Sequence, residues 1–348
     1  MKTFRLAFLL VLAACAAPAA IIDARDALPE PVTNNAVAFG RDAKGEGTIY
    51  SFLGLGPGKT WKDITTNAYA CVEATLDCRK IAGPPVEKGR LASVAASVAG
   101  KIYLFGGYTV AEDGAEKSTP EVFRFDPVTE QYARVADMPT PVDDSTAIVL
   151  FDRYVYLVSG WHDDGNVALT QVYDAKDDRW FRATDFPGAP VFGQAGGGSG
   201  AHLLVMGGVK AVAGDDGKRK FVASDEAWIG KVAPGAPESI EWSRAPLPPV
   251  GPFYRMAASS GRDLIYFAGG GDNPYNYNGV GYDGVAAKSS DRLIAFDPEK
   301  SEWTLVGDMP PSMDHRGLVA GEHGLYIVGG MGPDLSVSRS ITRIRMER

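Results

Sequence analysis

The fold is decided by the stretch Gly100-Lys101-Ile102-Tyr103-Leu104-Phe105-Gly106-Gly107, which a polar loop joins to Phe123-Arg124-Phe125-Asp126-Pro127, Tyr132 and Met138-Pro139. Its β-branched and aromatic run predicts a buried strand, and the glycine pair lets the backbone turn without a Cβ clash. Asp126-Pro127 predicts a turn into a return strand at Tyr132 to Val135. With Ala92 to Ala99, these segments predict a four-stranded antiparallel sheet. A sheet this small cannot bury both faces alone, so it is expected to repeat.

The signature of a strand that ends in glycine occurs six times. Consecutive copies lie 48 to 62 residues apart, and most precede a hairpin with an aromatic residue on its return strand, such as Tyr173-Asp174 with Trp180. The last glycines of the copies are Gly56, Gly107, Gly160, Gly208, Gly270 and Gly330. A period near 50 residues resembles the kelch repeat, which forms one four-stranded blade of a β-propeller. The resemblance covers Ala36 to the C-terminus and implies six blades.

Composition agrees with one large all-β domain. Hydrophobic residues make up 45% of the 348 residues, and the 41 glycines and 23 prolines are spread as expected for frequent turns between short strands. The last repeat ends after its third strand, at Ile341 to Met346, so we expect Ile21 to Ala27 to supply the fourth. We therefore predict a six-bladed kelch β-propeller at 20–348, closed by this N-terminal strand. The predicted blades are 33–82, 90–136, 143–184, 192–246, 253–306, and 314–348 together with 20–28.

Residues 1–19 have the pattern of an export signal. A positive region of Lys2 and Arg5 is followed by an apolar run too short to span a bilayer. Leu12-Ala13-Ala14-Cys15 resembles the lipobox of bacterial lipoproteins, which implies acylation of Cys15 and a lipid anchor in the outer membrane. The alternative is cleavage after Ala19, which leaves a soluble periplasmic protein. Both place the protein in the bacterial cell envelope, with membrane contact only through the anchor.

Two further cysteines are expected to pair. Aligned on the repeat, Cys71 takes the place of Phe125 and Cys78 that of Tyr132, facing positions on two strands joined by a turn. A disulfide across this hairpin is therefore expected in an oxidising compartment, the alternative being two reduced cysteines. Because no further ligand lies near them in sequence, we expect no metal there.

Charge and motifs narrow the classes of partner. The net charge of −8 argues against nucleic acid and against an anionic membrane surface. The run Gly196-Gly197-Gly198-Ser199-Gly200 is interpreted as a connection between two inner strands; since no helix follows, it does not predict a phosphate-binding loop. We therefore expect no cofactor.

The connections between repeats carry the candidate binding residues. In kelch propellers, the loops between blades and those from the second to the third strand open on one face around the central channel. Here these loops contribute charged and aromatic side chains, the composition of a polar small-molecule or sugar pocket. The candidate ligand-binding residues are Arg90, Trp161, His162, Tyr254, Arg255, Tyr275, Tyr277 and Arg316. Each has a structural alternative, since arginines can tie blades together and tyrosines can cover a channel.

A second resemblance concerns the first repeat. Leu28-Pro29-Glu30-Pro31-Val32, with Ile49-Tyr50, Gly54-Leu55-Gly56 and Trp61, resembles the opening of bacterial N-acetylneuraminate epimerases. This resemblance implies a periplasmic enzyme that interconverts the anomers of sialic acid. The acid/base glutamate of that family falls at Val209, and valine cannot transfer a proton. The candidate catalytic residues are therefore His315 and Asp144.

Two functions of different classes remain open from the sequence. In the first, an exported propeller binds a sugar such as N-acetylneuraminate in its channel and, as an isomerase, interconverts its anomers. In the second, a non-catalytic propeller holds another envelope protein on its loops, through residues such as Trp161 and Tyr275. Both describe a monomer.

Overall fold

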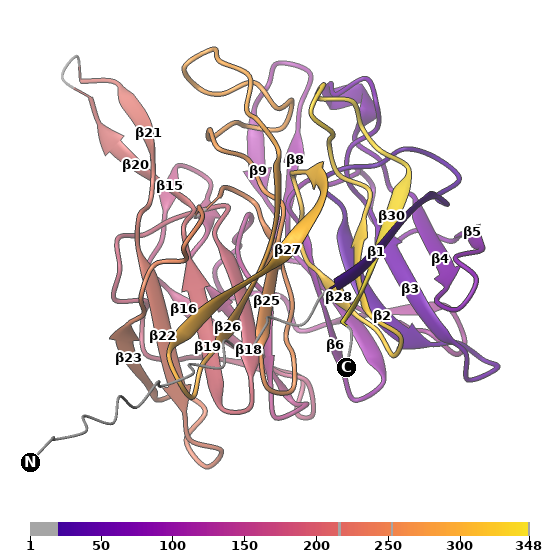
Figure 1. Cartoon of the computed structure of the whole chain (residues 1–348), viewed down its shortest axis with the longest axis horizontal. Coiled ribbons are helices and arrows are strands. Elements are labelled where there is room, and N and C mark those ends of the chain that lie inside the picture. The colour runs from indigo at the N-terminus through magenta and orange to yellow at the C-terminus, as the bar shows by residue number, and fades with distance from the viewer. Residues whose placement is uncertain (1–19, 215–216, 252, 347–348) are drawn as a thin grey trace, which may run out of the picture.

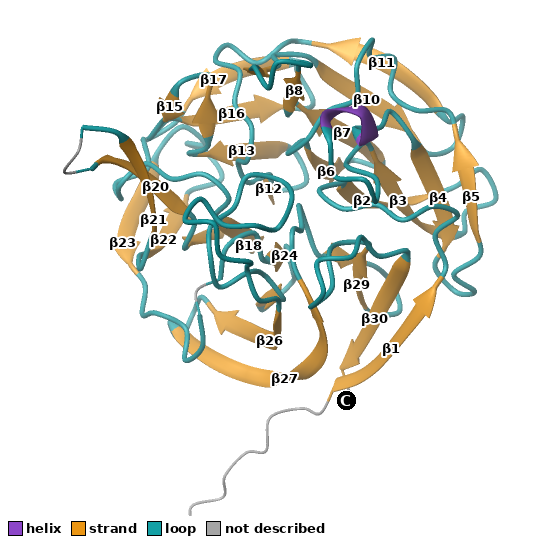
Figure 2. Ribbon diagram, turned by 90° about the horizontal axis from the view of Figure 1, so that it is seen from above, coloured by secondary structure: helices purple, strands orange, loops and turns teal. Residues whose placement is uncertain are grey.

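The computed structural model describes residues 20–214, 217–251 and 253–346. They form six four-stranded antiparallel sheets arranged as blades around a central axis (Figure 1, Figure 2). The predicted all-β, six-bladed propeller is confirmed. The predicted signal peptide, including Cys15, lies outside the described residues. Within the described ranges, no helix is long and apolar enough to cross a membrane.

Each blade runs from an inner strand beside the axis to an outer strand at the rim. Blade one consists of β2 (Ala36–Arg41), β3 (Gly47–Phe52), β4 (Ala68–Val72) and β5 (Cys78–Ile81). Blade two consists of β6 (Val94–Val98), β7 (Lys101–Phe105), β10 (Val122–Asp126) and β11 (Gln131–Val135). Blade three consists of β12 (Ile148–Leu150), β13 (Tyr154–Val158), β16 (Thr170–Asp174) and β17 (Arg179–Arg182). Blade four consists of β18 (Ala195–Ser199), β19 (His202–Met206), β22 (Ala227–Val232) and β23 (Ile240–Arg244). Blade five consists of β24 (Ala257–Ala258), β25 (Ile265–Ala268), β26 (Ser290–Asp297) and β27 (Glu302–Ser312). Blade six consists of β28 (Val319–Ala320), β29 (Leu325–Val328), β30 (Ser340–Met346) and β1 (Ala20–Asp26).

The connections from the second to the third strand carry additional elements. Blade one has a short 3-10 helix, η1 (Trp61–Asp63), in this connection. Blades two, three and four have hairpins made of β8 (Tyr108–Val110) and β9 (Glu116–Ser118), β14 (Trp161–His162) and β15 (Gly165–Asn166), and β20 (Val209–Ala213) and β21 (Arg219–Ala223). These elements lie at the upper side of Figure 1.

The two ends of the described chain close the ring. Strand β1 pairs with β30 along its whole length, from Ala20 opposite Met346 to Asp26 opposite Ser340. An ion pair between Asp23 and Arg343, at 3.0 Å, joins the same two strands. Because β1 covers what would otherwise be a free strand edge, the predicted closure by the N-terminal strand is confirmed.

The third and fourth strands of a blade place the predicted facing pairs opposite one another. Phe125 lies opposite Tyr132 in blade two, and Cys71 lies opposite Cys78 in blade one. The two cysteines form the predicted disulfide. The ring of Phe125 also packs edge-on against Tyr50 of blade one, with centroids 5.2 Å apart. Neighbouring blades therefore share a hydrophobic core, as expected for sheets too small to bury both faces alone.

The inner strand of blade four corrects one prediction. Gly196, Gly197 and Gly198 belong to β18 and do not form a connection. A Cβ on Gly197 would lie 2.1 Å from the backbone oxygen of Ser259 of blade five. The glycines are needed because inner strands of neighbouring blades approach closely, a tertiary reason that strand propensity does not reveal.

Candidate functional site

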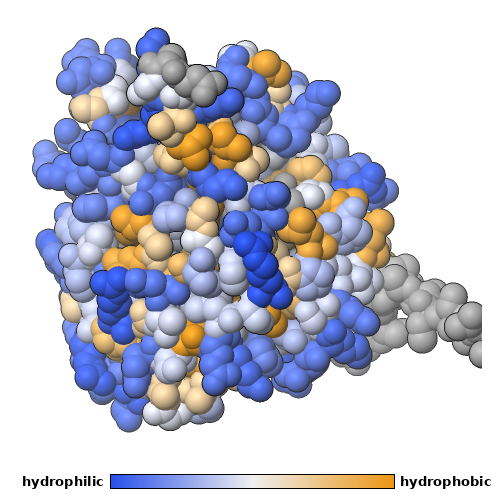
Figure 3. All heavy atoms as spheres, turned by 90° about the vertical axis from the view of Figure 1, so that its left-hand side faces the viewer, coloured by the Kyte–Doolittle hydropathy of each residue, from blue (hydrophilic) through white to orange (hydrophobic). Residues whose placement is uncertain are grey.

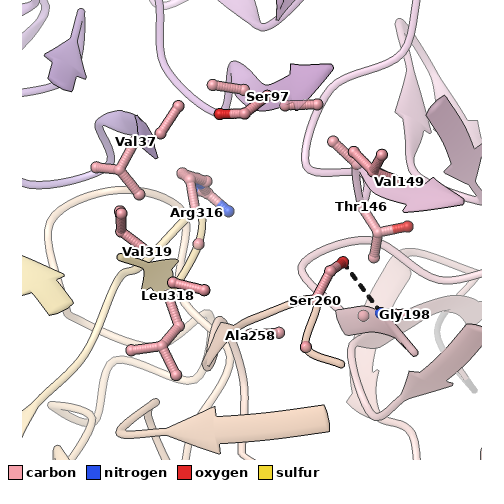
Figure 4. Close-up of a pocket in the computed structure, with 18 of the residues that line it drawn as sticks. Val37, Ser97, Thr146, Val149, Gly198, Ala258, Ser260, Arg316, Leu318 and Val319 are labelled. Carbon is pink, nitrogen blue, oxygen red and sulfur yellow. Dashed lines mark hydrogen bonds between the residues drawn. The ribbon is translucent and has the colours of Figure 1, made fainter. Parts of the chain in front are cut away.

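A cavity of about 420 Å³ lies on the axis between the six inner strands. Small apolar and hydroxyl side chains dominate its wall, so the strands leave room at the centre of the ring (Figure 4). The wall includes Val37, Ala95, Ser97, Thr146, Val149, Gly198, Ala258, Ser260, Leu318 and Val319.

The two ends of the cavity differ. We call the side with the turns between first and second strands the turn face, and the side with the interblade loops the loop face. Lining residues near the turn face, such as Ser97 and Asp152, are exposed, whereas Ser145 and Gln194 near the loop face are buried. Figure 2 looks onto the loop face, where loops gather over the middle of the ring. The cavity is therefore open at the turn face and closed at the loop face.

Six equivalent residues surround the closed end, one just before each inner strand. All have a left-handed backbone conformation. They are Asn34 (φ 59°), Ala92 (54°), Asp144 (49°), Gly193 (64°), Arg255 (53°) and Asp314 (67°). Backbone hydrogen bonds link them from blade to blade: Gly193 donates to Asp144 at 2.8 Å, and Arg255 donates to Gly193 at 3.0 Å. The repeat thus brings residues that are distant in sequence together around the axis.

Within this ring of residues, Arg255 pairs with two carboxylates. Its Nε and Nη2 donate to Oδ1 and Oδ2 of Asp144 at 3.1 and 2.6 Å, and its Nη1 donates to Oδ1 of Asp314 at 3.0 Å. The side chain is 1% exposed, and its guanidinium carbon lies 4.7 Å from the Tyr254 ring and 5.2 Å from the Tyr275 ring. Two carboxylates and two aromatic rings therefore satisfy this cation, which has no free edge for a ligand.

Arg316 lies beside this cluster and lines the cavity (Figure 4). Its Nη1 donates to Asp144, and its Nε donates to Oδ1 of Asn34 at 3.1 Å. Its Nη2 is buried and has no hydrogen-bond partner. The side chain is only 3% exposed. At the closed end, this Nη2 group donates no hydrogen bond but lies 3.7 Å from Oδ1 of Asp314.

Burial and the nearby arginines shift the pKa of the acidic side chains at this end in opposite directions. Burial alone would raise the pKa of Asp144, but Arg255 and Arg316 hold it below its usual value. For the adjacent Asp143, burial and then the charge of Asp144 raise the pKa well above its usual value. Burial, followed by the charge of Arg316, lowers the pKa of His315 to about 3. Near neutral pH, Asp144 is thus charged and His315 is uncharged.

Comparisons with known proteins address the repeat. A model of the kelch motif matches residues 89–139. Kelch-like protein 15 of Danio rerio is 23% identical over 244 residues, covering 66% of this chain and 37% of that protein. Beta-scruin of Limulus polyphemus is 24% identical over 239 residues, covering 67% of this chain and 24% of that protein. The solved structure of YjhT matches with a TM-score of 0.68 and 16% identity, covering 92% of this chain and 100% of that one.

The chain is a kelch-repeat β-propeller. The motif model matches the stretch that predicted the repeat, and the structural match supports the six-bladed fold. The chain spans about 37% of the Danio rerio relative. The sequence likeness therefore covers only part of each of these relatives.

Some predicted site residues of this kelch propeller meet at the closed end of the channel. Asp144, Arg255 and Arg316 are joined by ion pairs, and His315 is next to Arg316 in the chain. Asp314 and Asn34 complete the cluster but were not among the predicted site residues. The sequence signal for them is their position, because both occupy the repeat position of Asp144 and Arg255.

Other predicted site residues lie away from the cavity wall. Arg90 pairs with Glu121 at 2.9 Å and bonds the backbone oxygen of Gly106 at 3.3 Å, so it fixes a loop within blade two. In β14, Trp161 donates to the backbone oxygen of Asp163 at 2.8 Å. The ring Nδ1 of His162 lies 2.7 Å from the backbone oxygen of Pro141.

The tyrosines of the kelch loops form a cover over the closed end. Tyr275 is fully buried and packs edge-on against Tyr254, with ring centroids 5.2 Å apart. Tyr277 packs against a separate cluster around Leu55 and Leu91. Val209, at the position of the expected glutamate, is buried in the same apolar cluster as Tyr275.

Proposed function

We propose that this kelch propeller binds a small polyhydroxylated molecule, such as a sugar, in its central channel. The supporting observation is the cavity of about 420 Å³, open at the turn face and ending at Arg316. Ligand pockets are commonly about 300–1,000 Å³ in volume. Hydroxyl groups such as Ser97 and Ser260 alternate with apolar side chains such as Val149 along the wall. Such a wall suits a ring that presents both hydroxyl and C–H groups.

We further propose that the channel binds its ligand without interconverting its anomers. Anomerisation requires a group that exchanges a proton near neutral pH. His315, with its pKa lowered to about 3, and Asp144, held charged by two arginines, are both poorly suited to that task. Proton NMR of freshly dissolved N-acetylneuraminate is expected to show the same anomer exchange rate with and without the protein. A concentration-dependent acceleration would overturn this part of the proposal.

Isothermal calorimetry with N-acetylneuraminate and neutral monosaccharides tests binding. Ala320 is exposed and lines the open end of the channel, so Ala320→Trp narrows the entrance without altering the closed end. We expect this variant to bind about tenfold more weakly or worse, which is about 1.4 kcal/mol. The matched control is Ala74→Trp, at an exposed turn away from the cavity lining. Equal affinity of the two variants, or no binding of any sugar, would contradict the proposal.

An exposed hairpin favours protein binding as a second candidate function. In β20 and β21, Val212 and Val222 are 39% and 37% exposed. The adjacent Phe221 stacks on Tyr282 with ring centroids 4.0 Å apart. Figure 3 shows apolar surface on this otherwise largely hydrophilic side of the molecule. A partner recovered by the wild type and lost in Val222→Asp, with sugar binding unchanged, would support this function.

A further inference from the structure

We propose that Glu73, Glu322 and His323 form a binding site for a divalent transition metal such as Zn²⁺. The site lies at the seam between blade six and blade one. Glu73 follows β4 in the turn to β5, and the other two residues form the turn from β28 to β29. One ligand atom from each residue lies within 4.8 Å of the others.

The structure already orders these groups around one carboxylate. The backbone N–H of His323 donates to Oε1 of Glu73 at 2.7 Å and so holds the turn of blade six against blade one. A Cβ on Gly321 would lie 2.3 Å from Oε1 of Glu73, and one on Gly47 would lie 2.7 Å from its Oε2. Glycine on both sides therefore leaves space for the carboxylate. Glu322 and His323 are exposed, which gives an ion access from solvent.

Glu73 is a buried carboxyl group with no basic side chain paired to it. It is 1% exposed, and no lysine, arginine or histidine among the described residues lies within ion-pair distance of it. Its Oε2 is buried and accepts no hydrogen bond, although the Tyr326 hydroxyl is a close neighbour. The buried carboxylates Asp144 and Asp314, in contrast, are both paired with Arg255. Because a buried carboxylate without a counter-ion is unfavourable, a bound cation would stabilise this site.

The donor set selects the class of metal. One imidazole nitrogen and two carboxylate oxygens suit Zn²⁺, with water as a fourth ligand, whereas Ca²⁺ and Mg²⁺ prefer oxygen ligands alone. Glu322 pairs with Arg41 through Oε1 at 2.5 Å, which leaves its Oε2 for an ion. An ion bound here would join blades six and one at a point separate from the pairing of β1 with β30. It would therefore stabilise the closed ring.

Calorimetry and thermal unfolding of the full chain, without an affinity tag and after dialysis against a chelator, test the site. We expect one Zn²⁺ per chain and a rise in the unfolding temperature. His323→Ala and Glu322→Gln change exposed groups, so their metal-free unfolding temperature should match that of the wild type. Their Zn²⁺ affinity should fall about tenfold or more. The matched control Glu241→Gln removes an exposed carboxylate elsewhere and should bind Zn²⁺ like the wild type.

Two readouts separate a metal site from a purely structural cluster. Co²⁺ should give visible absorption bands of a four-coordinate site in the wild type, and these should be lost in His323→Ala. Glu73→Gln replaces the buried carboxyl group by a neutral amide, so it should abolish the stabilisation by Zn²⁺. Binding that His323→Ala leaves within twofold of the wild type would overturn the proposal, as would the absence of stoichiometric Zn²⁺ binding.

Discussion

At the scale of single residues, Arg255 closes the channel by neutralising two buried carboxylates. Asp144 and Asp314 are 4% and 0% exposed in their side chains, so removing the cation leaves two buried charges without their main partner. We predict that Arg255→Met lowers the free energy of unfolding by about 3–5 kcal/mol. Urea denaturation measures this loss. Arg182→Met breaks an exposed ion pair with Asp185 and is the control, with an expected loss below about 1 kcal/mol. Similar losses in both variants would contradict the role of Arg255.

His315 should make stability depend on pH. Its folded pKa, lowered to about 3 by burial and Arg316, lies below the ordinary value of 6.5, so the unfolded chain binds the proton more readily. Its contribution is complete above pH 6.5 and is lost as pH falls toward 3. We predict that this residue alone lowers the free energy of unfolding by about 2 kcal/mol between pH 7 and pH 5.

Urea denaturation across this pH range, compared with His315→Gln, isolates that effect. The variant is expected to start from a lower stability but to have a flatter dependence on pH. Parallel curves for the two proteins would show that His315 is not buried in its neutral form.

At the scale of elements, the hairpin of the third and fourth strands uses one facing position in different ways. Blade two places Phe125 opposite Tyr132 there, and blade one places Cys71 opposite Cys78. Because both pairs have the same strand register, aligning the repeats is sufficient to predict the disulfide. The disulfide takes the place of an aromatic contact in the repeat that departs most from the others.

This disulfide should contribute measurably to stability. The bridged residues are 7 apart in sequence, so the bond closes a short loop. We predict that replacing both cysteines by serine lowers the free energy of unfolding by about 2–3 kcal/mol. A reducing agent should lower the stability of the wild type by a similar amount and leave the double variant unchanged. A reductant effect that persists in the double variant would argue against this assignment.

At the scale of the whole molecule, ring closure depends on a strand from the other end of the chain. Strand β1 pairs 7 residues with β30, and Ile22 packs on the core between blades five and six. Deleting Ala20 to Asp26 should lower the free energy of unfolding by on the order of 5 kcal/mol, from lost hydrogen bonds and apolar burial. Thermal unfolding measures it, with Asp23→Ala as a control that removes only the ion pair to Arg343. Unchanged stability of the deletion would rule out closure by this strand.

The export signal predicted from the sequence gives a further whole-molecule prediction. If Cys15 is acylated, the wild type should fractionate with the outer membrane, and Cys15→Ala should move it to the soluble or unprocessed fraction. Fractionation of cells followed by immunoblotting measures the distribution. A wild type already in the soluble periplasmic fraction would instead favour cleavage after Ala19.

Patterns in the sequence were sufficient to predict the repeat, the number of blades, the closing strand and the cysteine pair. Each of these depends on local signals, namely glycine pairs after a strand, turn residues and facing positions within one hairpin. These signals act over a few residues, and their periodic recurrence is visible without coordinates. The glycines of β18 are the exception, because their role depends on contact with the next blade.

Which end of the channel is open, and which charged side chains line it, follows from contacts that form only in the folded ring. Arg255, Asp144 and Asp314 come from different blades, and the ring must close before each finds its partner. The sequence showed arginines and tyrosines on the loops but not that they satisfy one another there. The open cavity is instead lined by small side chains that carry little sequence signal. The physical reason is that burial and ion pairing depend on contacts between residues far apart in the chain, such as Asn34 and Arg316, which are 282 positions apart.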